Sequence, residues 1–222
     1  MRKPVAELTG ILFDLDGTLL DTLPDLAYAL NSVLIEEGRQ PLPAGMIKPA
    51  VSYGAPGMVR LAFGESQDQE VFAKRMAKLR ETYSDHVAER TRLFEGMDKV
   101  LEEIENRGLV WGIVTNKRRY LTEPLLEQLG LNHRVACVIA GDDTVKGKPH
   151  PEPLWTACQA MNISPAHCVY VGDHARDIEA GKRAGMGTLA AAYGYLAPDE
   201  DPFSWGADEV LQTPNDLLKW LS

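Results

Sequence analysis

The chain contains short runs that are apolar throughout and that alternate with helical patterns. The runs span residues 110–114, 135–140, 168–171 and 188–192. Strands that are apolar at every position, and not only at alternate ones, are typical of a parallel sheet covered on both faces. The intervening helical patterns each stop at a glycine, which suits the left-handed residue after a helix; they span 98–107, 120–129 and 178–184. The sequence therefore predicts an α/β fold with a doubly wound, Rossmann-like parallel sheet.

Residues 10–18, Gly-Ile-Leu-Phe-Asp-Leu-Asp-Gly-Thr, form an apolar run that ends in two carboxylates separated by one residue. Successive side chains of a strand point to opposite faces, so Asp14 and Asp16 can share one site only where the chain leaves the sheet. Carboxylates this close repel each other unless a cation or a shared proton offsets their charge. The motif indicates a metal site at a strand exit; the alternative is a polar turn that caps a helix.

Three further segments place polar residues near the ends of apolar runs. Thr115 directly follows one run, and Lys148 lies just before a helix start that prolines mark. Asp173 follows another run, with Asp177 four residues later. The order Asp-x-Asp, Thr, Lys and Asp-x-x-x-Asp resembles the haloacid dehalogenase superfamily, specifically its phosphatases. The resemblance covers nearly the whole chain.

Composition limits the partners and the location of the protein. With 222 residues the chain can bury a sizeable core, and its formal net charge of -9 argues against a nucleic-acid partner. No apolar run approaches the roughly 20 residues of a membrane span, and the run after Gly10 is too short for a signal peptide. We therefore expect a cytoplasmic protein that is a monomer or a homodimer and has no membrane partner.

The stretch from residue 22 to residue 90 has helical patterns but no obvious buried strand. Between Asp25 and Glu37, for example, apolar residues recur at the spacing of one helix face. A helical insert at this place resembles the cap domain of the superfamily's small-molecule phosphatases. We expect a catalytic core made of residues 1–21 and 91–222 and a cap made of residues 22–90; the alternative is a helical bundle with a structural role only.

The resemblance implies a role for each motif residue. Asp14 would be the nucleophile and would form an aspartyl-phosphate. Asp16 would protonate the departing alkoxide and then activate water as a base. Thr115 and Asn116 would bind phosphate oxygens, and Lys148 would bind phosphate and neutralise the charge that develops during transfer.

The resemblance also implies one cofactor, Mg²⁺, which prefers oxygen ligands. The expected ligands are the carboxylates of Asp14 and Asp173 and the backbone carbonyl of Asp16. Asp177 would lie in the outer shell, holding either Lys148 or a metal-bound water; the alternative is an acid favoured by the helix dipole. In the expected cap, Arg60 lies one turn after the Gly54–Gly57 turn and is a candidate substrate ligand.

The substrate is a small phosphate ester, and several branches of the superfamily remain open. Residues 148–153 and 193–195 resemble phosphoglycolate phosphatases, which act on a small carboxylated phosphate. Three other segments are closer to N-acetylmuramic acid 6-phosphate phosphatases; they span 93–97, 111–117 and 202–208. A β-phosphoglucomutase-like mutase shares the four motifs. From another class, a phospho-accepting receiver module also combines Asp, Thr and Lys, but it has no helical insert.

Overall fold

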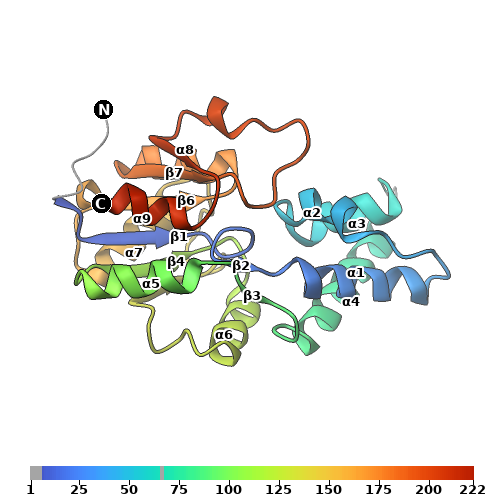
Figure 1. Ribbon diagram of the computed structural model, residues 1–222. Coiled ribbons are helices and arrows are strands. Elements are labelled where there is room, and N and C mark those ends of the chain that lie inside the picture. The colour runs from blue at the N-terminus through green and yellow to red at the C-terminus, as the bar shows by residue number, and fades with distance from the viewer. Residues whose placement is uncertain (1–6, 66–67) are drawn as a thin grey trace.

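The computed structural model describes residues 7–65 and 68–222, and its centre is a six-stranded parallel sheet (Figure 1). The strand order is β5-β4-β1-β6-β7-β8. The strands are β1 (Gly10–Phe13), β4 (Val110–Val114), β5 (Cys137–Ile139), β6 (Cys168–Gly172), β7 (Gly187–Ala191) and β8 (Glu209–Leu211). The predicted doubly wound sheet is confirmed, with β1 paired in parallel to both β4 and β6.

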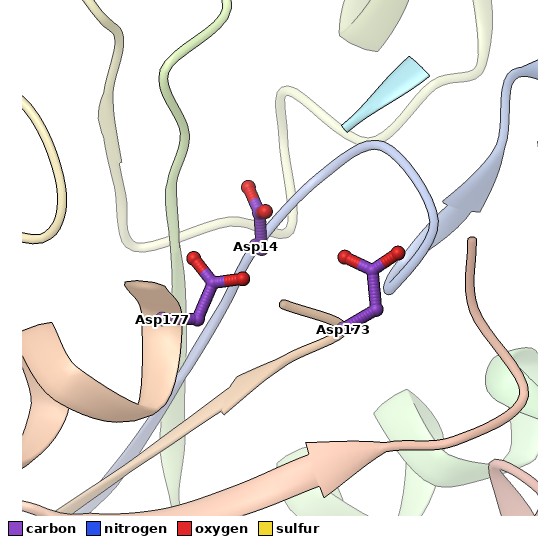
Figure 2. Close-up of side chains that lie close together, drawn as sticks. All are labelled: Asp14, Asp173 and Asp177. Atoms are coloured by element: carbon purple, nitrogen blue, oxygen red, sulfur yellow. The ribbon is translucent and has the colours of Figure 1, made fainter. Parts of the chain in front are cut away.

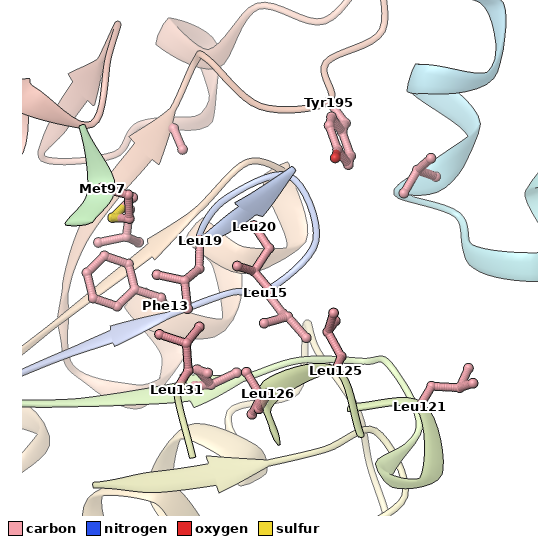
Figure 3. Packing of buried hydrophobic residues seen from close by; sticks show 14 of the residues in the cluster. Phe13, Leu15, Leu19, Leu20, Met97, Leu121, Leu125, Leu126, Leu131 and Tyr195 are labelled. Atoms are coloured by element: carbon pink, nitrogen blue, oxygen red, sulfur yellow. The ribbon is translucent and has the colours of Figure 1, made fainter. Parts of the chain in front are cut away.

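Helices cover both faces of the sheet, as its fully apolar strands require. They are α5 (Met97–Asn106), α6 (Arg119–Gln128), α7 (Glu152–Met161), α8 (Ala175–Ala184) and α9 (Asn215–Leu221). One face packs with α7 and α8 in a cluster that contains Leu12 and Tyr170. The other face packs with α5, α6 and α9 in a larger cluster, where Phe13 lies near Leu19 and Met97 (Figure 3).

Four helices form a separate layer beyond the carboxyl ends of the strands (Figure 1). They are α1 (Leu23–Glu36), α2 (Ala44–Val51), α3 (Gly54–Phe63) and α4 (Gln69–Asp85). The larger apolar cluster continues from the sheet into these helices. This layer occupies the segment expected to form a cap, whereas residues 1–6 of the expected core lie outside the described residues. The division into two domains stays a prediction.

Two short segments connect the helical layer to the sheet layer. Strands β2 (Leu20–Asp21) and β3 (Arg92–Leu93) pair antiparallel where the chain enters and leaves the four helices. The buried carboxylate of Asp25 accepts hydrogen bonds from the backbone N–H of Arg90 and from the N–H and hydroxyl of Thr91, at 2.7 to 3.1 Å. One carboxylate thus fastens the start of α1 to the returning chain.

In the described ranges, no helix is both long enough and apolar enough to cross a membrane. Cys137, Cys158 and Cys168 are free thiols and lie buried or half-buried. The expected cytoplasmic location and the monomeric or homodimeric state stay predictions.

Candidate active site

Three carboxylates meet at the carboxyl ends of β1 and β6. Asp14 directly follows β1, Asp173 directly follows β6, and Asp177 lies in the first turn of α8. All three are buried, and one ligand atom of each lies within 4.8 Å of the others (Figure 2). The sequence motifs, 159 residues apart for Asp14 and Asp173, are thus brought together by parallel pairing of β1 with β6.

The electrostatics of this triad favour a cation. Burial, together with the nearby charges of Asp14 and Asp177, raises the pKa of Asp173 to about 8. Burial also raises the pKa of Asp14, against the lowering effect of Lys148. Clustered carboxylate oxygens that resist ionisation without a counter-charge are the donor set that a hard divalent cation prefers. The residues present therefore fit a magnesium site.

Lys148 is buried and holds two members of the triad. Its Nζ lies 2.8 Å from Asp14 Oδ1 and 2.8 Å from Asp177 Oδ1. It also donates to the hydroxyl of Tyr170 at 2.7 Å and lies 3.1 Å from the carbonyl oxygen of Val114. Of the roles expected for Asp177, the ion pair favours holding Lys148.

Two of the residues predicted to bind phosphate lie in the loop after β4. Thr115 is buried and lines the cavity described below. The side chain of Asn116 is occupied by the backbone of Lys148: its Oδ1 accepts from the Lys148 N–H at 3.0 Å, and its Nδ2 donates to the Lys148 carbonyl at 3.2 Å. These two contacts position the Lys148 loop, and the expectation that Asn116 binds phosphate stays a prediction.

Asp16 has contacts that the sequence analysis missed. Its Oδ1 accepts from Lys117 Nζ at 2.8 Å and from the hydroxyl of Thr22 at 2.6 Å. Lys117 Nζ also donates to the hydroxyl of Tyr83 on α4 at 2.8 Å. Burial alone would lower the pKa of Lys117, but Asp16 and Tyr83 together raise it. One ammonium thus links the Asp-x-Asp loop to the helical layer.

A cavity of about 310 Å³ lies between the sheet ends and the helical layer. Asp14, Asp16 and Thr115 line it from the sheet side, and apolar side chains line it from the helices: Leu26, Val51, Met58 and Leu79. Two arginines that the sequence analysis did not propose as site residues, Arg80 and Arg176, also line it.

The structure does not place Arg60 in this cavity. Its Nε pairs with Glu65 Oε1 at 3.2 Å, and its guanidinium lies over the ring of Phe72. The Gly54–Gly57 segment, expected as a turn, is the first turn of α3, and Arg60 is not among the residues that line the cavity. The candidate substrate contact of Arg60 stays a prediction.

Fold and site together define a haloacid dehalogenase-type hydrolase, and comparison with known proteins agrees. Residues 11–191 match the family described as haloacid dehalogenase-like hydrolase, and the chain belongs to this family. It is 42% identical over 212 residues to an N-acetylmuramic acid 6-phosphate phosphatase of Pseudomonas putida, covering 96% of this chain and 95% of that protein. It is 40% identical over 219 residues to a phosphoglycolate phosphatase of Xanthomonas campestris pv. campestris, covering 98% and 96%.

The fold has a close match among solved structures. The crystal structure of a predicted phosphoglycolate phosphatase from Haemophilus somnus 129pt superposes with a TM-score of 0.87 at 26% sequence identity. The match covers 97% of this chain and 99% of that one. Membership of this family rules out the receiver-module alternative.

Proposed function

We propose that the protein is a magnesium-dependent phosphomonoesterase that acts through an aspartyl-phosphate. The observation that carries this proposal is the convergence of Asp14, Thr115, Lys148 and Asp173 at one edge of the sheet, beside a cavity of substrate size. Chemistry of this kind needs a nucleophile, cations and a proton donor in one place. The names of the curated relatives support the same reaction class.

In the proposed mechanism, Asp14 attacks phosphorus while Lys148 holds its Oδ1 in place and so fixes the direction of the other oxygen. Asp16 gives a proton to the departing oxygen and then takes one from water. In the structure Lys117 Nζ and the Thr22 hydroxyl both contact Asp16 Oδ1, so these contacts hold the carboxylate while its Oδ2 can reach the substrate oxygen. The hydroxyl of Thr115, which directly follows β4 and lines the cavity with Asp14, would donate to a phosphoryl oxygen.

The carboxylates of Asp14 and Asp173 and the backbone carbonyl of Asp16 would hold the magnesium ion. When bound, Mg²⁺ supplies Lewis-acid stabilisation of the phosphoryl oxygens and offsets their repulsion from Asp14. Asp177 keeps Lys148 in reach of this group through its ion pair. Residues 22–90 would act as a cap that excludes water and contacts the rest of the substrate.

The cavity favours a substrate larger than glycolate. A volume of about 310 Å³ corresponds to roughly ten water molecules, and its apolar lining from the helices offers contact to a carbon skeleton. We therefore propose a carboxylated sugar phosphate of the size of N-acetylmuramic acid 6-phosphate as the preferred substrate, and phosphoglycolate as the second candidate.

A phosphate-release assay with magnesium tests this proposal. We expect release from N-acetylmuramic acid 6-phosphate at the highest kcat/KM, lower values for phosphoglycolate, and loss of activity with chelator that magnesium restores. Asp14→Asn is the matched inactive control. Release that is highest for phosphoglycolate would reverse the substrate order, whereas isomerised sugar phosphate without free phosphate would indicate the mutase alternative.

A further inference from the structure

Arg176 is a cationic residue that lines the cavity. It is the second residue of α8, lies between Asp173 and Asp177 in the sequence, and lines the cavity together with Asp14. Its Nε is buried and has no hydrogen-bond acceptor among the described residues. Within the same ranges its guanidinium forms no ion pair, although three carboxylates lie nearby; only its backbone N–H is bonded, to His174 Nδ1.

A buried arginine N–H that lacks an acceptor costs free energy, and buried donors in native proteins nearly always have an acceptor. The acceptor is therefore expected from a molecule that enters the cavity. A guanidinium presents its donors as a planar fork that matches the oxygens of phosphate or carboxylate. The geometry thus points to an anionic oxygen of a ligand.

The donors of Lys148 are already engaged in the arrangement observed. An ammonium has three N–H donors, and Lys148 Nζ already lies within 3.1 Å of four oxygens: those of Asp14, Asp177, Tyr170 and Val114. Its donors are occupied in orienting the nucleophile. A phosphoryl oxygen that approaches Asp14 needs a donor from elsewhere.

The charges around Asp14 lead to the same requirement. Three carboxylates face a single ammonium, so two negative charges are in excess before a dianionic phosphoryl group arrives. A divalent cation brings this local sum only to zero. The positive charge of Arg176, which lines the cavity together with Asp14, acts at the same place.

We propose that Arg176 is a catalytic residue that binds a nonbridging oxygen of the phosphoryl group, beside Lys148. This inference rests on the proposed function, since it names a further ligand of the same group. It adds no covalent step: the guanidinium donates hydrogen bonds and stays protonated while the phosphoryl group moves to Asp14 and then to water. Its contact is common to every phosphomonoester, so it does not select among substrates.

The test compares Arg176→Gln and Arg176→Lys with Arg183→Gln, an exposed arginine of the same helix that pairs with Glu179. We expect Arg176→Gln to lower kcat/KM by about tenfold to 100-fold on both a sugar phosphate and 4-nitrophenyl phosphate, the value of one charged hydrogen bond. Arg176→Lys should retain part of the activity, and Arg183→Gln should match the wild type.

Binding of inorganic phosphate with magnesium gives a second measurement that does not depend on turnover. The increase in melting temperature caused by phosphate should be smaller for Arg176→Gln than for the wild type and for Arg183→Gln. A loss confined to carboxylated substrates, with phosphate affinity unchanged, would overturn the proposal and make Arg176 a carboxylate ligand. Unchanged phosphate affinity together with unchanged kcat/KM would also overturn it.

The two proposals fail in different ways. If the wild type binds phosphate but hydrolyses no ester, the proposed function is wrong, and the comparison of phosphate affinities still decides the role of Arg176. If the wild type hydrolyses esters and Arg176→Gln does so equally well, only the inference about Arg176 is wrong.

Discussion

Asp173→Asn should stabilise the metal-free protein, although it removes a proposed metal ligand. Asp173 is buried, its carboxylate pairs with no cationic side chain among the described residues, and it accepts hydrogen bonds from the backbone N–H of Tyr195 at 2.8 Å and from the hydroxyl of Thr18 at 3.3 Å. An amide side chain can keep both contacts, since Thr18 can also accept. The substitution therefore mainly removes a carboxyl group that is costly to ionise.

The magnitude follows from the two pKa values of Asp173. In the folded protein without metal the pKa is raised to about 8, whereas an aspartate in an unfolded chain titrates at about 3.9. Between these values the unfolded chain has lost the proton and the folded protein has kept it, so stability falls as pH rises through this window. At about 1.4 kcal/mol per pH unit, the loss at pH 7 has an upper bound of roughly 4 kcal/mol.

Thermal and urea unfolding of wild type, Asp173→Asn and the exposed control Asp199→Asn, each with chelator, measure this effect. We expect the free energy of unfolding of Asp173→Asn to exceed that of the wild type by about 2–4 kcal/mol at pH 7. This difference should be smaller at pH 5. Excess magnesium should make the wild type more stable than Asp173→Asn, because only the wild type is stabilised by binding the metal. A metal-free Asp173→Asn protein that is no more stable than the wild type at pH 7 would refute the reasoning.

Three further substitutions test the site and its connection to the helices. Asp14→Asn should abolish phosphate release while the melting temperature stays close to that of the wild type; residual turnover by pure variant would exclude Asp14 as the nucleophile. Lys117→Met releases Asp16, so kcat should fall more for alkyl phosphates than for 4-nitrophenyl phosphate, and equal losses would contradict this. Asp25→Ala leaves the buried donors of Thr91 unpaired and should cost about 2–4 kcal/mol in urea unfolding; a cost below 1 kcal/mol would show that the contact is dispensable.

The sheet could be predicted because each strand is indicated by a few consecutive apolar residues. The central strands β1, β4 and β6 are apolar at every position, and the acids Asp14 and Asp173 directly follow two of them. In a parallel sheet the carboxyl ends share one edge, so residues at those ends gather without knowledge of the loops. The bounds of α2 are harder to predict, since Pro49 lies inside it and proline is a poor helix former.

The contacts of the long side chains could not be predicted in this way. Asn116, Lys117 and Arg118 are consecutive, yet they point to the Lys148 backbone, to Asp16 and to the cavity rim. Their directions depend on the exact turn after β4 and on what the helices bring to it. A sequence pattern fixes which loop carries a residue, but not which of several neighbours its side chain meets.

The net charge of the whole chain does not predict the charge of the cavity either. The chain as a whole is acidic, with a formal net charge of -9, and this sum argues against polyanionic partners. The cavity has the opposite sign: four cationic side chains line it against only two carboxylates, namely Arg80, Lys117, Arg118 and Arg176 against Asp14 and Asp16. Since a low-dielectric cleft concentrates the field of the charges that line it, this local sum governs which ligands enter. An acidic protein can therefore draw in a small phosphate ester while its outer surface repels larger anions.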